Sequence, residues 1–138
     1  MSNNSKQKYY EIFNNTIDLF FKDWIKVFPN DKDFIVFKTS INGAAMINYK
    51  LPQQYFNMYL TPDYISNIKS RNDNFFINHN YNQYINDYAK NEFYNENEIN
   101  QLIDKIKEYW KNINDSNRVI IWEYMDNLIK INDLILNQ

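Results

Sequence analysis

The sequence predicts an all-α fold: a compact bundle of about five or six helices with a C-terminal antiparallel helical hairpin. Apolar residues recur at spacings of three and four along most of the 138 residues, as they do on one face of a helix. One Gly and three Pro are too few for the many tight turns of a sheet protein. Aromatic residues make up 18% of the chain, and their large rings can fill the core of a single domain spanning residues 1–138.

The first predicted helix covers residues 5–28 and follows a stretch, about residues 1–5, that we expect to be disordered. Pro29 disfavours helical geometry at Phe28, so the helix should end there. Its core face consists of apolar side chains at helical spacing, namely Tyr10, Phe13, Ile17, Phe20 and Trp24.

Residues 31–50 indicate a second helix, with Asp31 near its N-cap. A strand remains an alternative at its start, because the apolar run FIVF at residues 34–37 also fits a buried strand. The only glycine, Gly43, weakens the helical pattern further along. We predict a helix here and leave the assignment of residues 34–37 open.

Residues 51–62 are bounded by two prolines and indicate an irregular or extended connector. Thr61 and Pro62 then favour a helix start, because Thr is a good N-cap and Pro fits the first helical position. A further helix is expected at about residues 81–88, where tyrosines recur at helical spacing.

Two C-terminal helices, from about Asn95 onward, show the most regular pattern. The turn between them is short, and Ser116 fits as the N-cap of the last helix. A short turn favours antiparallel neighbours, which predicts the hairpin and a frame made of this hairpin and the N-terminal helix. The predicted core comprises Phe13, Ile17, Phe20, Trp24, Ile103, Ile106, Trp110, Ile121, Leu128 and Ile131.

The last helix carries two apolar rows beside one narrow polar stripe. The first row runs from Ile121 to Ile135, and the second consists of Trp122, Met125 and Ile129. A helix with two apolar rows needs two neighbours. One should be the preceding helix, and the other is either the N-terminal helix or another protein chain.

The residue types argue against an enzyme or a metal protein. There is no Cys, and His79 is the only histidine, so we expect no zinc–thiolate site, no Cys nucleophile and no metal ligand set. A single Gly cannot build a phosphate-binding loop. We therefore expect no catalytic, cofactor-binding or metal-binding residue, and no cofactor.

The charge balance of 15 basic and 17 acidic residues gives no electrostatic reason to expect nucleic acid as the partner. No apolar run approaches the roughly 20 residues of a membrane span, which makes an intracellular soluble protein the expectation. Nucleic-acid association is kept as an alternative for residues 71–94, where aromatic rings that could stack on bases accompany Arg71 and Lys90.

The leading hypothesis is a non-enzymatic interaction or structural protein that binds a protein partner, or a second copy in a homo-oligomer, through apolar helix faces. The aromatic excess and the second row of the last helix motivate it. The candidate partner-binding residues are Trp122, Met125, Ile129, Phe75, Phe76, Tyr81, Tyr84 and Tyr88.

Three short motifs carry a family resemblance: Phe28-Pro29, the sequence NDNFF at Asn72–Phe76, and IWEYMDNL at Ile121–Leu128. In this order they resemble small uncharacterised all-helical proteins of large nucleocytoplasmic DNA viruses, the giant viruses. The abundance of Asn, Ile, Lys and Tyr, which have A/T-rich codons, is consistent with such a source. The resemblance implies a helical viral protein of the host cytoplasm or virion, with a role in assembly, the virion or host interaction, and it transfers no activity.

Overall fold

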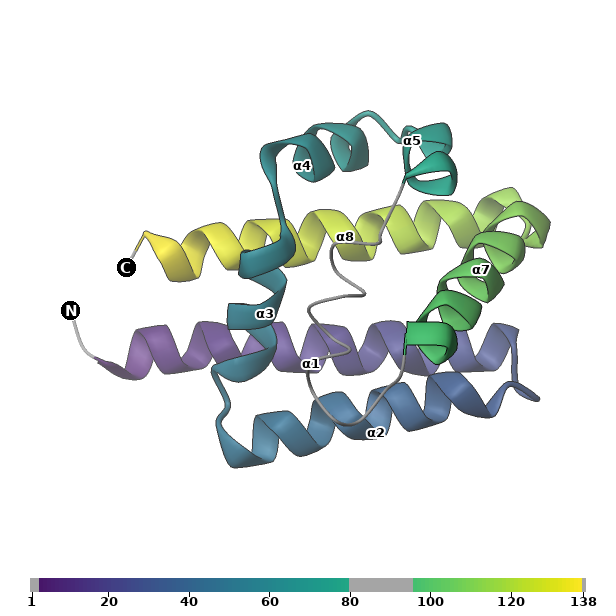
Figure 1. Cartoon of the computed structure of the whole chain (residues 1–138). Coiled ribbons are helices and arrows are strands. Elements are labelled where there is room, and N and C mark those ends of the chain that lie inside the picture. Colours follow the sequence, from purple (N-terminus) through teal and green to yellow (C-terminus); the bar gives the residue numbers. More distant parts are fainter. Residues whose placement is uncertain (1–2, 80–95, 138) are drawn as a thin grey trace.

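The computed structural model of the protein describes residues 3–79 and 96–137, and within these ranges it contains seven helices and no strand (Figure 1). The predicted all-α class is confirmed, and residues 34–37 are helical. The helices are α1 (Asn3–Val27), α2 (Lys32–Ile47), α3 (Leu51–Tyr59), α4 (Pro62–Lys69), α5 (Asp73–Asn78), α7 (Glu96–Asn112) and α8 (Asp115–Leu136).

Two segments differ from the prediction. The first helix already begins at Asn3, inside the stretch expected to be disordered. The expected connector is instead helical over α3, with Pro52 in its first turn, where the missing N–H of proline costs no helical hydrogen bond. The helix expected at residues 81–88 lies outside the described residues.

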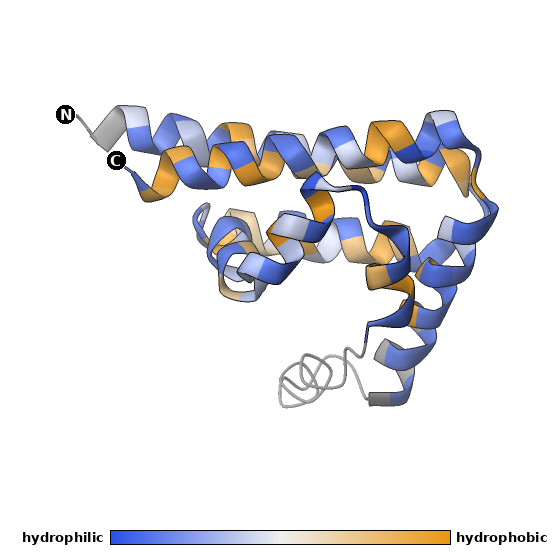
Figure 2. Ribbon diagram, turned by 90° about the horizontal axis from the view of Figure 1, so that it is seen from above, coloured by the Kyte–Doolittle hydropathy of each residue, from blue (hydrophilic) through white to orange (hydrophobic). Residues whose placement is uncertain are grey.

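The helices α1 and α8 form the frame of the fold. They run antiparallel beside each other, and α2 packs along the other side of α1 (Figure 1). The short helix α3 crosses this layer and contacts both α1 and α2, while α4 packs on α8. Figure 2 shows α1 and α8 together along one edge of the molecule.

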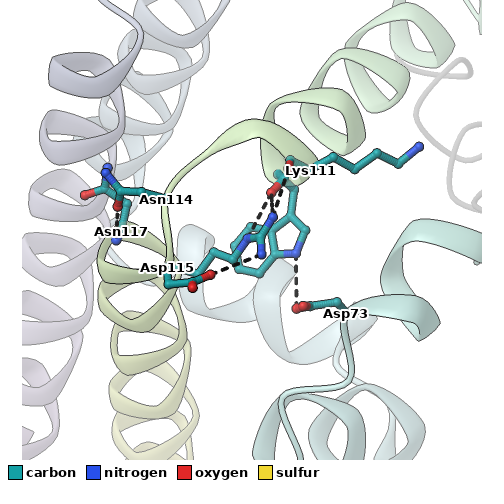
Figure 3. A network of polar contacts seen from close by, with 7 residues as sticks. Asp73, Lys111, Asn114, Asp115 and Asn117 are labelled. Carbon is teal, nitrogen blue, oxygen red and sulfur yellow. Dashed lines mark hydrogen bonds and ion pairs between the residues drawn. The ribbon is translucent and has the colours of Figure 1, made fainter.

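The turn between α7 and α8 is short, as predicted, but the two helices diverge from it instead of lying side by side (Figures 1 and 2). Asn114, not Ser116, is the N-cap of α8, and its side chain accepts a first-turn amide hydrogen at 2.8 Å. The Arg118 guanidinium donates hydrogen bonds to the carbonyl oxygens of Trp110 and Lys111, which closes the turn (Figure 3). The helix that lies antiparallel beside α8 is therefore α1, and not α7 as the prediction of a hairpin implied.

The core between α1 and α8 is centred on Phe13, which is completely buried and meets Phe56 of α3 edge-on. Phe13, Trp24 and Leu128 are buried as predicted. Ile106 is 40% exposed, against the prediction, because α7 leaves the bundle. The other predicted core residues are partly buried, namely Ile17, Phe20, Ile103, Trp110, Ile121 and Ile131.

The second apolar row of α8 is covered within the chain. Trp122 and Ile129 are 9% and 4% exposed and cluster with Ile68 of α4. Phe76 of α5 packs against the same cluster, with its ring 5.9 Å from that of Trp122. The second neighbour of α8 is therefore the α4–α5 segment, while α1 covers the first row.

A buried pair of amides fixes α3 against α8. Gln53 and Asn132 are each 3% exposed, and Gln53 Nε2 donates to Asn132 Oδ1 at 2.7 Å. Asn132 Nδ2 in turn donates to Asn57 Oδ1 at 3.2 Å. Because buried polar groups are costly unless they are paired, this network favours one register of α3 on α8.

Candidate functional site

The predicted partner-binding residues of α8 do not form a free surface. Trp122 and Ile129 are buried, and the partly buried Met125 packs against both core clusters. On α5, Phe75 and Phe76 pack against the ring of Tyr64. Three of the predicted residues lie outside the described ranges, namely Tyr81, Tyr84 and Tyr88.

Arg71, the described basic residue of the predicted nucleic-acid segment, has its charge engaged within the fold. Its guanidinium forms an ion pair with Asp126 and lies 5.6 Å from the centre of the Trp122 ring. The hydrogen bond from Arg71 lowers the pKa of Asp126, against the opposing effect of burial. These contacts hold the α4–α5 turn on α8.

The densest polar cluster joins α7 to the turn between α1 and α2. Tyr109 donates to Asp31 Oδ2 at 2.7 Å, and Lys105 Nζ lies 3.2 Å from the same carboxylate and also pairs with Asp33. Asp31 is the N-cap of α2 as well, and the ring of Tyr109 stacks on Phe28 at 4.0 Å. The cluster borders an open depression, but its two carboxylates and the ammonium of Lys105 are paired with one another, which is the arrangement of a structural tie.

Burial opposes the ionisation of Asp31. Hydrogen bonds from Tyr109, from the Asp33 amide and from Lys105 outweigh it, so that the pKa of Asp31 is lowered. The pKa of Lys105 is raised, chiefly by its hydrogen bond to Asp33. Both groups are therefore charged, and their ion pair keeps α7 against the turn between α1 and α2.

Within residues 3–79 and 96–137, no three acidic or histidine side chains are grouped closely enough to hold a metal ion. None of the helices in the described part of the chain has the length and apolar character that crossing a membrane requires.

An exposed and mainly apolar surface lies on one side of α2. Counting along the helix places Ile35, Val36, Thr39, Ser40, Gly43, Met46 and Ile47 on the side away from the buried Phe34, and we call these residues the α2 outer face. Ile35 and Val36 are 46% and 52% exposed, and Met46 and Ile47 are 88% and 85% exposed.

Charge meets the α2 outer face only in the first turn of α2, where Lys32 precedes Ile35 and Val36 by three and four residues and so lies on the same side of the helix. The charged residues of α2 are Lys32 and Asp33 in its first turn and Lys38, whose ammonium pairs with Asp18 of α1 at 3.2 Å. Asn42 donates to the same carboxylate, so Lys38 and Asn42 point toward α1, and from Ile35 to Ile47 the outer side carries no charge.

The two hydroxyl groups of the α2 outer face are already hydrogen-bonded. Thr39 donates to the carbonyl oxygen of Ile35 at 2.9 Å, and Ser40 donates to that of Val36 at 3.0 Å. A partner could cover the surface without leaving a hydroxyl donor unpaired. At Gly43 a Cβ atom would meet nothing within 4 Å, so the space outside this position is open.

On α1 and α8 the exposed apolar residues are mixed with charges, whereas α3 has no charged residue and also exposes Tyr55 and Met58, at 45% and 64%. Leu19 on α1 is 52% exposed, as much as Val36, but Asp18 and Lys22 lie next to it or one turn away. Leu134 on α8 is 40% exposed and follows Asp133. Single exposed apolar residues are common on soluble proteins, whereas the α2 outer face groups four of them on one side of one helix.

The sequence contained a signal for the α2 outer face that the prediction missed. The run FIVF and the later Met46-Ile47 place apolar residues on all sides of one helix. A helix that is apolar all round is normally covered all round. We interpreted that pattern as an ambiguity between helix and strand rather than as a surface.

Comparison with known proteins finds no match: no family model, no curated protein and no solved structure is similar to this chain.

Proposed function

We propose that the protein is a non-enzymatic interaction or structural protein that binds a protein partner through the α2 outer face. The observation that carries this proposal is the exposure of four large apolar side chains, Ile35, Val36, Met46 and Ile47, on one side of α2 where no charged residue follows Lys32 of the first turn. Complete burial of an apolar side chain is worth about 1.5–3 kcal/mol, so a protein that covers this surface gains substantial free energy.

The α2 outer face is also held in position before any partner arrives. Phe34 buries the inner side of α2 against Trp24 of α1, with ring centres 5.4 Å apart. Asn42 and Lys38 both bind Asp18 across the same contact. A fixed helix loses little conformational entropy on binding, which favours affinity.

Nucleic-acid association has weaker support, because Arg71 is already paired with Asp126. The resemblance to giant-virus proteins supports a viral setting for the proposed role, in assembly, in the virion or in contact with a host protein.

The test is site-specific photo-cross-linking in the cells that make the protein. A photoreactive amino acid replaces Met46 in one variant and Leu19 in a control variant. We expect a discrete protein adduct from position 46 that disappears when Val36→Glu is added, and no such adduct from position 19. Equal adducts from both positions, or none from position 46, would contradict the proposal.

A further inference from the structure

We infer that Asn42 is a site of spontaneous covalent modification, which is protected while α2 is folded and is converted to a carboxylate when α2 opens. The product weakens the contact of α2 with α1, so that a chain that has opened is marked and hindered from refolding. The inference rests on the Asn42-Gly43 pair, on the helical backbone around it and on the contact of Asn42 with Asp18. It is independent of the proposed function, because no partner takes part in it.

The Asn42-Gly43 pair is the position of this chain at which the conversion of asparagine is least hindered. An asparagine side chain is converted when the backbone nitrogen of the next residue attacks its side-chain carbonyl carbon. Glycine offers this nitrogen without a side chain to crowd it and with the widest choice of backbone angles. Gly43 is the only glycine among the 138 residues, so Asn42 is the only asparagine that precedes one.

The reaction needs no enzyme, oxidant or cofactor. The backbone nitrogen of Gly43 loses its proton and forms a bond to Cγ of Asn42, while the bond from Cγ to Nδ2 breaks. The Nδ2 group leaves with that proton as ammonia, and a five-membered cyclic imide remains. Water then opens the imide at either carbonyl group, adding a hydroxyl to the carbon and a proton to the nitrogen. The product at position 42 is aspartate or isoaspartate, in which the main chain runs through the side-chain carbonyl carbon.

The folded α2 keeps the two reacting atoms apart. Asn42 and Gly43 lie inside the helix Lys32–Ile47, where each backbone amide donates to the carbonyl oxygen four residues earlier. The backbone N–H of Gly43 is therefore directed along the helix axis, away from the side chain of Asn42. That side chain is held separately, because its Nδ2 donates to Asp18 Oδ1 on α1 at 3.2 Å. Ring closure requires the helix to open at this point.

The helix α2 should open more easily than the whole fold. Phe34 is the one buried residue of its 16, and segments with few buried contacts open at a lower free energy than the core does. Gly43 lowers the stability of the helix around it. Nothing in the described part of the chain would touch a Cβ at this position, so packing does not require a glycine here. The reactive pair therefore lies in a segment that is intermittently available.

Both products oppose the return of α2 to α1. Isoaspartate inserts one extra carbon into the main chain inside the helix, which shifts the following amides out of register. Aspartate keeps the main chain but removes the Nδ2 donor and places a carboxylate beside Asp18. Lys22 and Lys38 pair with Asp18 at 3.1 and 3.2 Å and offset part of this repulsion. Isoaspartate is therefore the product with the larger effect.

Conversion rates in the folded and the unfolded chain test the protection of Asn42. The full chain is incubated at pH 8 in buffer and in guanidinium chloride, and mass spectrometry of its peptides measures the conversion of each asparagine. In guanidinium chloride, Asn42 should convert faster than every other asparagine. In buffer its conversion should be about tenfold slower or more, because only the opened fraction reacts. Equal rates in the two solutions, or faster conversion of another asparagine in denaturant, would overturn the inference.

Gly43→Ala is the matched control that separates the reactive pair from the fold. The added Cβ meets nothing in the described part of the chain, and Ala favours helices more than Gly does, so the variant should fold at least as stably as the wild type. The methyl group crowds the attacking nitrogen, and the conversion of Asn42 in guanidinium chloride should fall severalfold. An unchanged rate would overturn the role of the Asn42-Gly43 pair.

Pulse proteolysis tests the effect of the product on refolding. Wild type that has been partly converted in denaturant is returned to buffer and exposed briefly to a protease, at a urea concentration at which the unmodified chain stays folded. Chains with isoaspartate at position 42 should be digested first, so their share of the intact protein should fall. Asn42→Asp, which adds the charge without the extra carbon, should lower the urea midpoint by a smaller amount. Modified chains that survive as well as unmodified ones would overturn the effect on refolding.

Discussion

Tyr124 on α8 donates a hydrogen bond from its hydroxyl to the carboxylate of Asp23 on α1 at 2.5 Å, across 101 residues of sequence. The ring of Tyr124 packs edge-on against Phe20 of α1. The hydrogen bond to Asp23, together with burial, raises the pKa of Tyr124 to about 12. This contact makes the pairing of the two frame helices sensitive to alkaline pH.

The stabilising effect of Tyr124 should decline between pH 10 and 12. An unfolded tyrosine titrates near pH 10, so above this pH the unfolded chain loses a proton that the folded chain keeps. The contribution is complete below pH 10 and declines by at most about 1.4 kcal/mol per pH unit, less solvent screening at this partly exposed group. Urea unfolding of wild type and Tyr124→Phe at pH 8, 10 and 11 measures it. A difference between the two proteins that stays constant with pH would contradict this assignment.

Asp31→Asn should loosen α7 while leaving the start of α2 intact. Asn caps helices as well as Asp does, but it lacks the charge that attracts Lys105. Hydrogen exchange should become faster in α7 and stay unchanged in α1 and α8. Because the folded pKa of Asp31 is lowered, the wild-type contribution is present above the unfolded pKa near 3.9 and is lost as pH falls through the folded pKa. Uniform acceleration in all helices would show that the cluster supports the whole fold.

Asn132→Ala should destabilise the protein by about 1–3 kcal/mol, because it leaves the buried amide of Gln53 without its partner. The double variant Gln53→Leu/Asn132→Leu removes both polar groups and should recover part of that loss. Denaturant unfolding of the wild type, of Gln53→Leu, of Asn132→Leu and of the double variant measures the coupling energy between the two amides. If the losses simply add, the two amides are not energetically coupled.

Trp122→Glu should prevent folding, whereas Val36→Glu should not. Trp122 is 9% exposed within the α4–α5–α8 cluster, where a carboxylate would be buried among apolar side chains and the neighbouring Arg71 is already paired with Asp126. Val36 is 52% exposed on α2, so a carboxylate there stays in water. Circular dichroism and thermal unfolding distinguish the two. A folded Trp122→Glu protein would mean that the second row of α8 is not part of the core.

Local spacing was sufficient to predict the helices that bury one clear face. The face of α1 around Phe13 and Trp24 and that of α8 around Leu128 are buried as their periodicity predicted. The neighbour of α8 could not be predicted in the same way, because contacts such as Tyr124 to Asp23 join residues far apart in sequence. Periodicity also shows that α2 carries apolar residues on more than one side, but only the packing on α1 shows which side stays exposed.

The pairing of α1 with α8 has a consequence for synthesis on the ribosome. The most extensive contact between two helices joins α1 to α8, the first and the last described helix. The main packing contact of the fold is therefore also the one with the greatest sequence separation. Folding rates fall as contacts become less local, because a long loop must close first. Until α8 has left the ribosome, the apolar face of α1 around Phe13 is covered only in part, by α3. A nascent chain that lacks α8 should therefore be a substrate for chaperones.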